Sequence, residues 1–441
     1  MEPTTIGLAA LVTALALLAA RVPVALALAG VAAVGMFLIH ATGGGMAVQA
    51  FGLTGAALTA DLVDLAQNAD LWMVPLFVGL GNIALYTGIT TRIYDAAAVW
   101  LRPLPGGVAM ASVMGCGGFS AISGSSVACA STMGRICIPE MLRMGYDSRL
   151  ATSAVAVGGT LGALIPPSVL FILFGIFTGT PIAQLFLAGL LPGLLSLAGM
   201  LLVIGWWVSQ DPRAAPAGKA ADSATRRHAA LAAWPAVLLF GVIVGGISSG
   251  ALTPTGAAAV CVALTIAIGI VQNRLSRDVL WHAVRETLMQ TAVIFLIAAA
   301  AKVFVSFVAL TGVADAILGG MQGAGMSFAV LMLCVVVIYL LLGMFLDPVA
   351  IMVLTLPFMV PLVEGYGLNL IWFGVVVVKL IEIGLITPPV GLNVFVVSNV
   401  TKGIGIDKIF AGVWRFLFVD LLVLALLILF PVISLLIPGA M

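Results

Sequence analysis

Apolar runs of about twenty residues follow one another along almost the whole chain, and they constrain the fold more than any other feature. A helix needs roughly 20 residues to cross a bilayer, and in lipid only helices or closed barrels satisfy every backbone group. Only 8% of the 441 residues are charged, against roughly 25% in soluble domains. We therefore expect an all-α polytopic membrane protein with no soluble domain beside its helices. The runs lie near 5–20, 22–39, 71–88, 108–141, 148–175, 182–207, 231–247, 255–272, 291–310, 328–363, 370–398 and 412–437.

Charge and cysteine content exclude several classes of function. A net charge of +1 provides no electrostatic footprint for nucleic acid. The five cysteines have neither metal-ligand nor disulfide spacing, so we expect no cofactor and no metal other than a coupling ion. The N-terminus carries Glu2 and lacks the basic region of a cleavable signal, which predicts that the first apolar run is a retained helix.

The distribution of basic residues predicts a topology. The most polar stretch, 209–230, reads as a linker between a first half, 1–208, and a second half, 231–441. It is separated by two helices from the basic loop 272–286, so both lie on one side, which the positive-inside rule assigns to the cytoplasm. The acidic segment 52–70 and both termini then fall outside. The other basic residues of the cytoplasmic set are Arg21, Arg92, Arg102, Arg143, Arg149, Lys402 and Lys408, and those of the linker are Arg213, Lys219, Arg226 and Arg227.

Two apolar segments fit this topology only as re-entrant hairpins. Basic residues flank both ends of 108–141, so it enters and leaves from the cytoplasm, and 328–363 lies between Asp315 and Glu364 with no basic residue nearby. The second hairpin therefore enters from outside, opposite the first. Because irregular backbone at membrane depth must be buried in protein or line a wet cavity, opposed hairpins predict such a cavity.

The two halves match in sequence at a constant offset of 222 residues. An odd number of crossings between equivalent positions inverts the second copy, which agrees with the opposite flanking charges. Inverted repeats with broken helices are typical of secondary transporters that bind substrate at the midplane. The matching positions are Pro139 and Pro361, Gly145 and Gly367, Gly162 and Gly384, Pro166-Pro167 and Pro388-Pro389, and Val127-Ala128 and Val349-Ala350.

Hydroxyl-bearing residues form the expected turn of the first hairpin, at Ser120–Ser126 around Gly124. Such a turn exposes carbonyl and hydroxyl oxygens together, and oxygen ligands of this kind can hold a sodium ion. The second half of the cage is offered by Ile165–Ser168, because its two prolines free helix carbonyls near the middle of 148–175. The structural alternative is a kink packed by small residues.

The second copy carries Gly343–Pro348 in its hairpin and Gly384–Asn393 in the broken helix 370–398. Asp347 is costly in the membrane unless it is partnered, and it either caps a half-helix that begins at Pro348 or takes part in transport. Thr387 and Asn393 are candidates for contacting ligand or ion. The positive ends of half-helices suit an anionic substrate.

Four further polar residues leave alternatives open. Lys379 and Glu382 lie three apart on one helix and can pair with each other, or one of them contacts the substrate or a hairpin. Lys302 is isolated in 291–310 and either snorkels or pairs. Asn82 either packs in the core or lines the transport path.

These residues resemble a known family, the large membrane subunit of the tripartite ATP-independent periplasmic (TRAP) transporters. The resemblance covers about residues 5–438, and the order of its motifs is specific although each motif alone is weak. It implies an elevator mechanism, with sodium at the hairpin tips and substrate between them. The segments that carry it include GGVAMASVMGCGGFSAISGSSVA, IPEMLRMGYDSRLATSAVAVGGTLGALIPPS, LLGMFLDPVAIMVLTLPFMVPLVEGYGLN and FGVVVVKLIEIGLITPPVGLNVFVV.

The resemblance assigns site residues and partners. It implies a small four-helix (DctQ-like) subunit, a periplasmic (DctP-like) binding protein that delivers a C4-dicarboxylate, sialic acid or related organic acid, a bacterial inner-membrane location, and no role for ATP. Ser126, Ser168, Thr387 and Asn393 are the expected substrate contacts. The expected sodium ligands are Ser123, Gly124, Ser125, Ser126, Pro166, Pro167 and Ser168 at the first site, and Gly343, Asp347, Thr387, Pro388, Pro389 and Gly391 at the second.

Two departures from the family and three competing functions also follow from the sequence. Cys129 stands where many members have aspartate, and Gly256 where many have glutamate.

A stand-alone sodium–carboxylate symporter or anion exporter of similar architecture would need no binding protein. The chain lacks the motifs of an intramembrane protease. No histidine lies in a helix core, as the serine type requires, and no GxG motif precedes Asp347, as the aspartyl type requires. A channel fits the repeated hairpins less well than alternating access does.

Overall fold

The computed structural model describes residues 2–42, 47–216, 218, 220–401 and 403–440, and within them every regular element is a helix. Lys219 and Lys402, two members of the expected cytoplasmic set, lie outside the described residues. Among the described residues, eight helical segments are long and apolar enough to cross a membrane, or nine if the bent pair of α12 and α13 counts as one more. The structure confirms the predicted all-α membrane fold.

The first half consists of two N-terminal helices (α1 and α2), a long broken span (α3 to α4), a short helix (α5), a hairpin (α6 and α7), a second broken span (α8 to α10) and a long last helix (α11). Its elements are α1 (Pro3–Ala19), α2 (Val24–Thr42), α3 (Ala47–Gln67), η1 (Ala69–Trp72), α4 (Met73–Tyr86), α5 (Ile89–Leu101), α6 (Gly107–Ser123), α7 (Ser126–Arg143), α8 (Ser148–Gly158), α9 (Leu161–Leu164), α10 (Val169–Thr178) and α11 (Ile182–Gln210).

The second half repeats that order after a short linker. The linker contains η2 (Pro212–Ala214) and most of α12 (Ser223–Ala232), and the second half contains α13 (Trp234–Ser248), α14 (Pro254–Val271), α15 (Arg277–Thr311), α16 (Val313–Gly323), α17 (Phe328–Gly343), α18 (Pro348–Gly365), α19 (Leu370–Gly384), α20 (Leu392–Val400), α21 (Ile406–Leu429), α22 (Val432–Leu435) and η3 (Pro438–Ala440). The pair α13–α14 corresponds to α1–α2, the single helix α15 to α3 and α4 together, and the hairpin α17–α18 to α6–α7.

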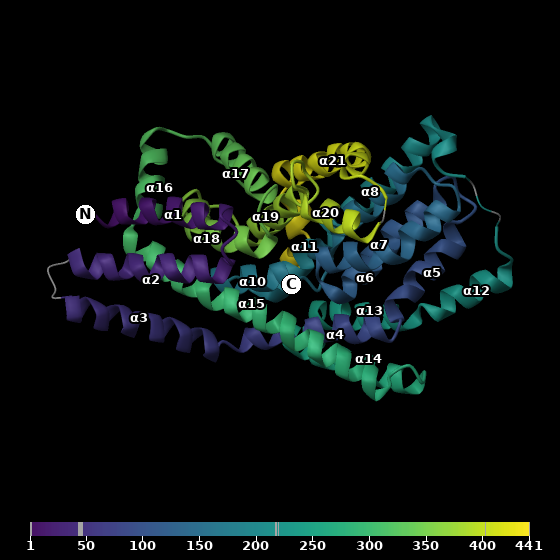
Figure 1. The fold of residues 1–441 in the computed structure, drawn as a ribbon, viewed down its shortest axis with the longest axis horizontal. Helices are drawn as coiled ribbons and strands as arrows, with labels where there is room; N and C mark the ends of the chain where they lie inside the picture. The colour runs from purple at the N-terminus through teal and green to yellow at the C-terminus, as the bar shows by residue number, and fades with distance from the viewer. Residues whose placement is uncertain (1, 43–46, 217, 219, 402, 441) are drawn as a thin grey trace.

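The halves interlock in space. In Figure 1, α1 and α2 lie at the left end of the molecule, α13 and α14 lie right of its centre, and α15 runs from α14 towards α1 and α2, beside α3 and α4. Helices α1 and α2 share an apolar core with the C-terminal half of α15, for example at Leu28 and Phe304. The hairpins and broken helices lie in the main core, around Phe171, Trp372 and Phe373.

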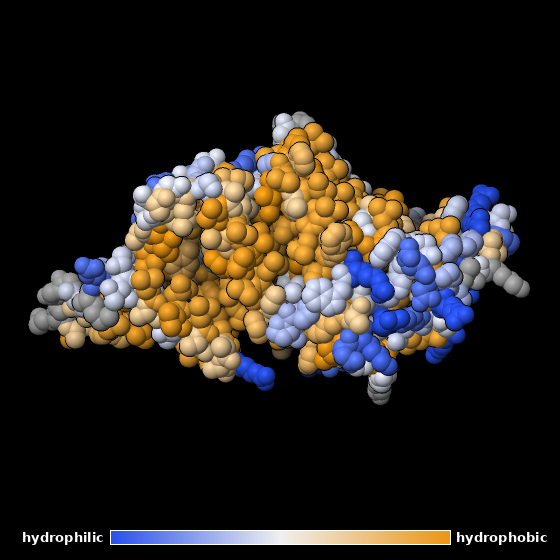
Figure 2. Space-filling view, turned by 90° about the horizontal axis from the view of Figure 1, so that it is seen from above, coloured by the Kyte–Doolittle hydropathy of each residue, from blue (hydrophilic) through white to orange (hydrophobic). Residues whose placement is uncertain are grey.

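The surface is apolar over its middle, as expected for lipid contact. Figure 2 shows hydrophobic residues across the centre of the molecule and hydrophilic residues gathered at the end where Figure 1 places α12 and the turn between α7 and α8. The linker packs against this end, since the Asp147 N–H donates to the Ala214 carbonyl at 2.8 Å. Trp100 likewise donates to the Arg226 carbonyl at 3.2 Å.

Candidate functional site

The tip of the first hairpin is a tight turn made by small residues. Helix α6 ends at Ser123, and Gly124 follows with φ +64°, a conformation that favours glycine. The Gly124 N–H closes the helix on the Ser120 carbonyl at 3.0 Å. Ser125 then caps α7 by accepting from the Ala128 N–H at 3.4 Å. The hydroxyl-rich turn therefore forms where the sequence indicates.

This tip lies directly on the break of its own repeat. The Val169 N–H donates to the Gly124 carbonyl at 3.3 Å, and a Cβ on Gly124 would lie only 2.6 Å from the Pro167 oxygen. Pro166-Pro167 is a cis peptide in the break, after which Ser168 caps α10 through the Phe171 N–H at 3.3 Å. The structure thus brings the expected first-site residues together.

The second hairpin meets its break in the same way. A Cβ on Gly384 would lie 2.5 Å from the Gly343 Cα, so the two helices touch through glycine backbone. Asp347 caps α18 by accepting from the Val349 and Ala350 N–H groups at 3.0 and 3.1 Å. This geometry supports the capping interpretation of Asp347, whose carboxylate also borders the cavity described below.

The break in the second repeat spans 385–391 and contains the cis pair Pro388-Pro389. Gly391 takes φ +56° before α20 begins. The Thr387 hydroxyl donates to the Ile383 carbonyl at 2.6 Å. Asn393 is fully buried, donates to the Ala156 carbonyl at 3.3 Å, and its Oδ1 has no partner among the described residues. Asn393 therefore connects α20 to α8, across the repeats.

Of the two alternatives left open for Lys379 and Glu382, the internal pair does not form, whereas the contact of one residue with a hairpin is observed at Glu382. Lys379 instead donates to Asp420 of α21 at 2.5 Å and to Ser196 of α11 at 3.0 Å. Glu382 accepts from Ser126 at 2.6 Å, across 256 residues of sequence. A helical i,i+3 spacing permits a pair but does not impose one, and both side chains found partners on other helices. The lone carboxylate Asp420 in the run 412–437 was the overlooked signal.

A cavity of about 1100 Å³ lies between the first hairpin and two scaffold helices. Each of three helices contributes residues at the spacing i, i+3, i+4, i+7 and i+8, which is one helix face. The tip residues 123–126, Asp347 and Glu382 line the cavity as well. The helix faces are Val78, Gly81, Asn82, Leu85 and Tyr86 of α4, Ala128, Ser131, Thr132, Arg135 and Ile136 of α7, and Glu286, Met289, Gln290, Val293 and Ile294 of α15.

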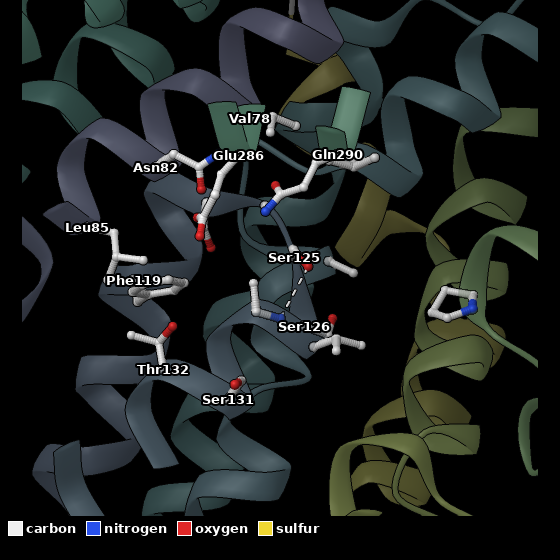
Figure 3. A pocket seen from close by; sticks show the side chains of 18 of the residues that line it. Val78, Asn82, Leu85, Phe119, Ser125, Ser126, Ser131, Thr132, Glu286 and Gln290 are labelled. Carbon is white, nitrogen blue, oxygen red and sulfur yellow. Dashed lines mark hydrogen bonds between the residues drawn. The ribbon is translucent and has the colours of Figure 1, made fainter. Parts of the chain in front are cut away.

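Polar side chains from the scaffold meet the hairpin across this cavity. Figure 3 shows Asn82, Glu286 and Gln290 converging near Ser125, with Thr132 farther along α7. Asn82 donates to the Thr287 hydroxyl at 3.0 Å, which joins α4 to α15. Asn82 therefore both lines the cavity and holds two scaffold helices together.

The expected substrate residues are divided between the cavity and the protein interior. Ser126 lines the cavity, whereas Ser168, Thr387 and Asn393 do not border it and are buried in the breaks behind the tips. Arg135, Glu286 and Gln290 border it, although sequence reasoning passed over them. No local signal singled them out, because α7 also carries Glu140 and Arg143, and Glu286 and Gln290 stand among other polar residues in the first part of α15.

Lys302 takes the paired alternative. Its ammonium lies 2.7 Å from the Asp64 carboxylate of α3, with 34% and 70% of the two side chains exposed. Asp61 of the same acidic segment accepts from Ser306 at 2.7 Å. The segment 52–70 is thus mostly helical and interacts with α15 through these two side-chain contacts.

The chain matches the family model of the DctM component of the tripartite ATP-independent periplasmic transporter over residues 11–433. The Vibrio cholerae sialic acid TRAP transporter large permease protein SiaM is 32% identical over 426 residues, 96% of each chain. The Pseudomonas aeruginosa C4-dicarboxylate large permease DctM is 30% identical over 387 residues, 87% of this chain and 89% of that protein.

Two further comparisons bear on assembly and fold. An isethionate permease DctMQ of Oleidesulfovibrio alaskensis is 30% identical over 338 residues, 76% of this chain and 53% of that longer protein. The crystal structure of the Alcanivorax borkumensis YdaH transporter has a TM-score of 0.61 at 16% identity, covering 86% of this chain and 88% of that one, and supports the fold. The relatives are named as permeases, not enzymes. The chain belongs to the DctM family of large TRAP transporter permeases, which are multi-pass inner-membrane proteins.

Proposed function

We propose that this chain carries an organic acid, of the C4-dicarboxylate, sialic acid or related class, across the bacterial inner membrane by sodium-coupled elevator transport. The observation that carries the proposal is the cavity between the first hairpin and helices α4 and α15. It is bordered by a hairpin tip docked on a broken helix on one side and by scaffold helices on the other. Secondary transporters place their substrate site at this kind of boundary.

A buried oxygen at the first tip supports sodium coupling. Ser123 Oγ is buried without a partner among the described residues. Buried polar atoms are normally satisfied, so a cation held by this oxygen and by backbone carbonyls of the neighbouring break accounts for it. The proposed sodium ligands remain those of the two tip-and-break pairs, with Ser126 between sodium and substrate.

The division into two bodies supports the elevator. The proposed moving body contains both hairpins and both breaks, which are joined across the repeats by the bond from Ser126 to Glu382 and by the bond from Asn393 to Ala156. The proposed scaffold contains α1–α4 and α13–α15, joined by the contact of Asn82 with Thr287. Movement of one body against the other would carry the cavity from one membrane face to the other.

The charge distribution supports an orientation. We assign the hydrophilic end that carries α12 and the linker to the cytoplasm by the positive-inside rule, and both termini to the periplasm. A DctQ-like small subunit and a DctP-like binding protein complete the transporter, in keeping with the tripartite description of the family and the DctMQ name of one relative. ATP has no part in this scheme, and no cofactor beyond sodium is required.

The test is uptake by proteoliposomes that contain this chain, its small subunit and the ligand-loaded binding protein. We expect uptake under an inward sodium gradient and none under an equal potassium gradient. Sodium-driven uptake that persists without the binding protein would instead support a stand-alone symporter. Equal uptake under both gradients would refute sodium coupling.

A pair of serine variants ties the result to the hairpin tip. We expect Ser126→Ala to weaken the sodium response, because the hydroxyl borders the cavity and bonds Glu382. Ser209→Ala is the matched control, since its hydroxyl is exposed and bonds only the Trp206 carbonyl of its own helix. An unchanged sodium response in Ser126→Ala would remove this residue from the site.

A further inference from the structure

A groove of about 540 Å³ lies on the surface between α5 and α12, and shares no residue with the transport cavity. Figure 1 shows these two helices side by side at the end of the molecule away from α1 and α2. Trp100 of α5 forms one side of the groove. The other side is one face of α12, with the helical spacing i, i+3, i+4, i+7 and i+8, made by Ser223, Arg226, Arg227, Ala230 and Leu231.

The groove is lined by two guanidinium groups and by no carboxylate. Among the described residues, no acidic side chain lies within 4 Å of Arg226 or Arg227. Asp222, the acid nearest to them in sequence, is exposed at the start of α12. Arg226 Nε is buried and has no hydrogen-bond partner in the described part of the chain. An arginine fork without a partner suits a phosphate or carboxylate group, so the groove is suited to an anion.

Trp100 holds Arg226 in position. The guanidinium carbon of Arg226 lies 5.9 Å from the centroid of the Trp100 ring, which is a cation–π distance. The indole N–H of Trp100 also donates to the Arg226 carbonyl at 3.2 Å. Both the backbone and the side chain of Arg226 are therefore held against α5, and an anion that binds there immobilises little further side-chain freedom.

The α12 face changes from polar to apolar along its length. Its serine and two arginines lie in the first five residues of the helix, whereas Leu231 follows Arg227 by four residues, a rise of about 6 Å. Leu231 is exposed, as is Trp234, which begins the apolar helix α13 at a bend of 44°. Basic residues directly before a spanning helix, with tryptophan at the boundary, lie at the level of lipid headgroups. The apolar end of the groove then borders the acyl chains.

We infer that this groove binds an anionic phospholipid of the phosphatidylglycerol type. Its phosphate lies on Arg226 and Arg227, and an acyl chain runs along Leu231 and the Trp100 ring. A zwitterionic phospholipid carries an ammonium group beside its phosphate, which two unpaired arginines disfavour. A soluble phosphate would leave the apolar end of the groove unfilled. Neither sodium nor the transported substrate takes part, so the inference stands apart from the proposed function.

Native mass spectrometry of the purified full-length chain in detergent measures the bound lipid directly. We expect the first phosphatidylglycerol molecule to bind at least about tenfold more tightly than phosphatidylethanolamine with the same acyl chains. Glycerol 3-phosphate, which presents the phosphate without acyl chains, should not displace it at equal concentration. Equal affinity for the two lipids, or displacement by glycerol 3-phosphate, would overturn the inference.

A double variant locates the lipid on the protein. Arg226→Gln with Arg227→Gln should weaken phosphatidylglycerol binding about tenfold and abolish the preference over phosphatidylethanolamine. Arg277→Gln with Arg285→Gln is the matched control, because both arginines are exposed near the start of α15 and lie outside the groove. The control removes the same charge and should change binding little, since salt screens exposed charges that do not contact the lipid. Equal losses in the two double variants would show that net charge, and not the groove, attracts the lipid.

A substitution at the apolar end tests the acyl-chain contact without changing either arginine. Leu231→Asn, at an exposed position, should weaken phosphatidylglycerol binding about fivefold. Unchanged binding in this variant would overturn the placement of the acyl chain. The titration is repeated with the small subunit present, where we expect the same affinity. Displacement of the lipid by the small subunit would assign the groove to the contact between subunits and overturn the inference.

Discussion

Replacing Asp420 with asparagine should destabilise the fold far more than loss of a surface charge, because it leaves the Lys379 ammonium buried without its carboxylate. The pair is separated by 2.5 Å, and the two side chains are 1% and 3% exposed. Removing one partner of such a pair costs about 3–5 kcal/mol. Two features favour the lower end of that range: Ser196 still accepts from Lys379, and Glu382 lies one turn away on the same helix.

The double variant Lys379→Met with Asp420→Leu is expected to recover the loss. Apolar replacement of a whole buried ion pair is often neutral or stabilising, by up to about 4 kcal/mol. The assay is the free energy of unfolding from SDS titration in mixed micelles. Lys302→Met is the matched control, because its pair with Asp64 is largely exposed and should contribute at most about 1 kcal/mol.

Two outcomes would refute the role assigned to the buried pair of Lys379 and Asp420. If Asp420→Asn costs no more than Lys302→Met, the buried pair does not carry the charge balance assigned to it. A double variant that is as unstable as Asp420→Asn alone would show that packing around α11, α19 and α21, and not the unpaired ammonium, determines the loss.

Three further predictions follow from contacts elsewhere in the chain. Gly384→Ala should cost about 1–3 kcal/mol of unfolding free energy, because its Cβ would lie 2.5 Å from the Gly343 Cα. Gly319→Ala on α16 is the control and should not destabilise, since nothing lies within 4 Å of the added Cβ. Equal losses of stability for the two variants in SDS titration would contradict the contact. Asp347→Asn should retain the helix cap and change the unfolding free energy little, while Asp347→Ala should cost about 0.5–2 kcal/mol. If the asparagine variant lost sodium-driven uptake while its stability was unchanged, Asp347 would have a role in transport. The Arg149 guanidinium lowers the pKa of Asp147, so the ionised carboxylate stabilises the fold above its unfolded pKa of about 3.9, and this stability is lost as the pH falls through the folded pKa. Arg149→Gln should therefore reduce the fall of the thermal unfolding midpoint at acid pH. An unchanged fall would refute the linkage.

The architecture could be predicted because membrane insertion leaves strong marks in the sequence. The hairpin around Gly124 and the break at Pro166-Pro167 combine an apolar context with residues that cannot continue a helix. The proline pair recurs at Pro388-Pro389, at the constant offset of 222 residues, which distinguishes a sequence repeat from a chance match in a biased composition. The capping role of Asp347 followed from its position directly before a proline, which is a local property.

The partners of charged residues could not be predicted, because they depend on which helices meet. Lys379 reaches Asp420 across 41 residues, and Ser126 reaches Glu382 across 256. Local spacing favoured the pair of Lys379 and Glu382, and tertiary packing overrode it. Only the presence of a lone acid in an otherwise apolar run indicated that Asp420 needs a partner.

The faces that line the cavity were hidden for a physical reason that applies to membrane proteins generally. In water, a helix turns apolar residues inward and polar residues outward, so the period of 3.6 residues identifies its buried face. In this chain lipid and protein interior are both apolar, and α4, α7 and α15 present similar residues to each. What marks the cavity face on α4 is the single polar residue that lipid would not tolerate, Asn82. An isolated polar side chain in an apolar helix is therefore a stronger pointer to the transport path than any periodic pattern, although only the fold shows that these side chains converge.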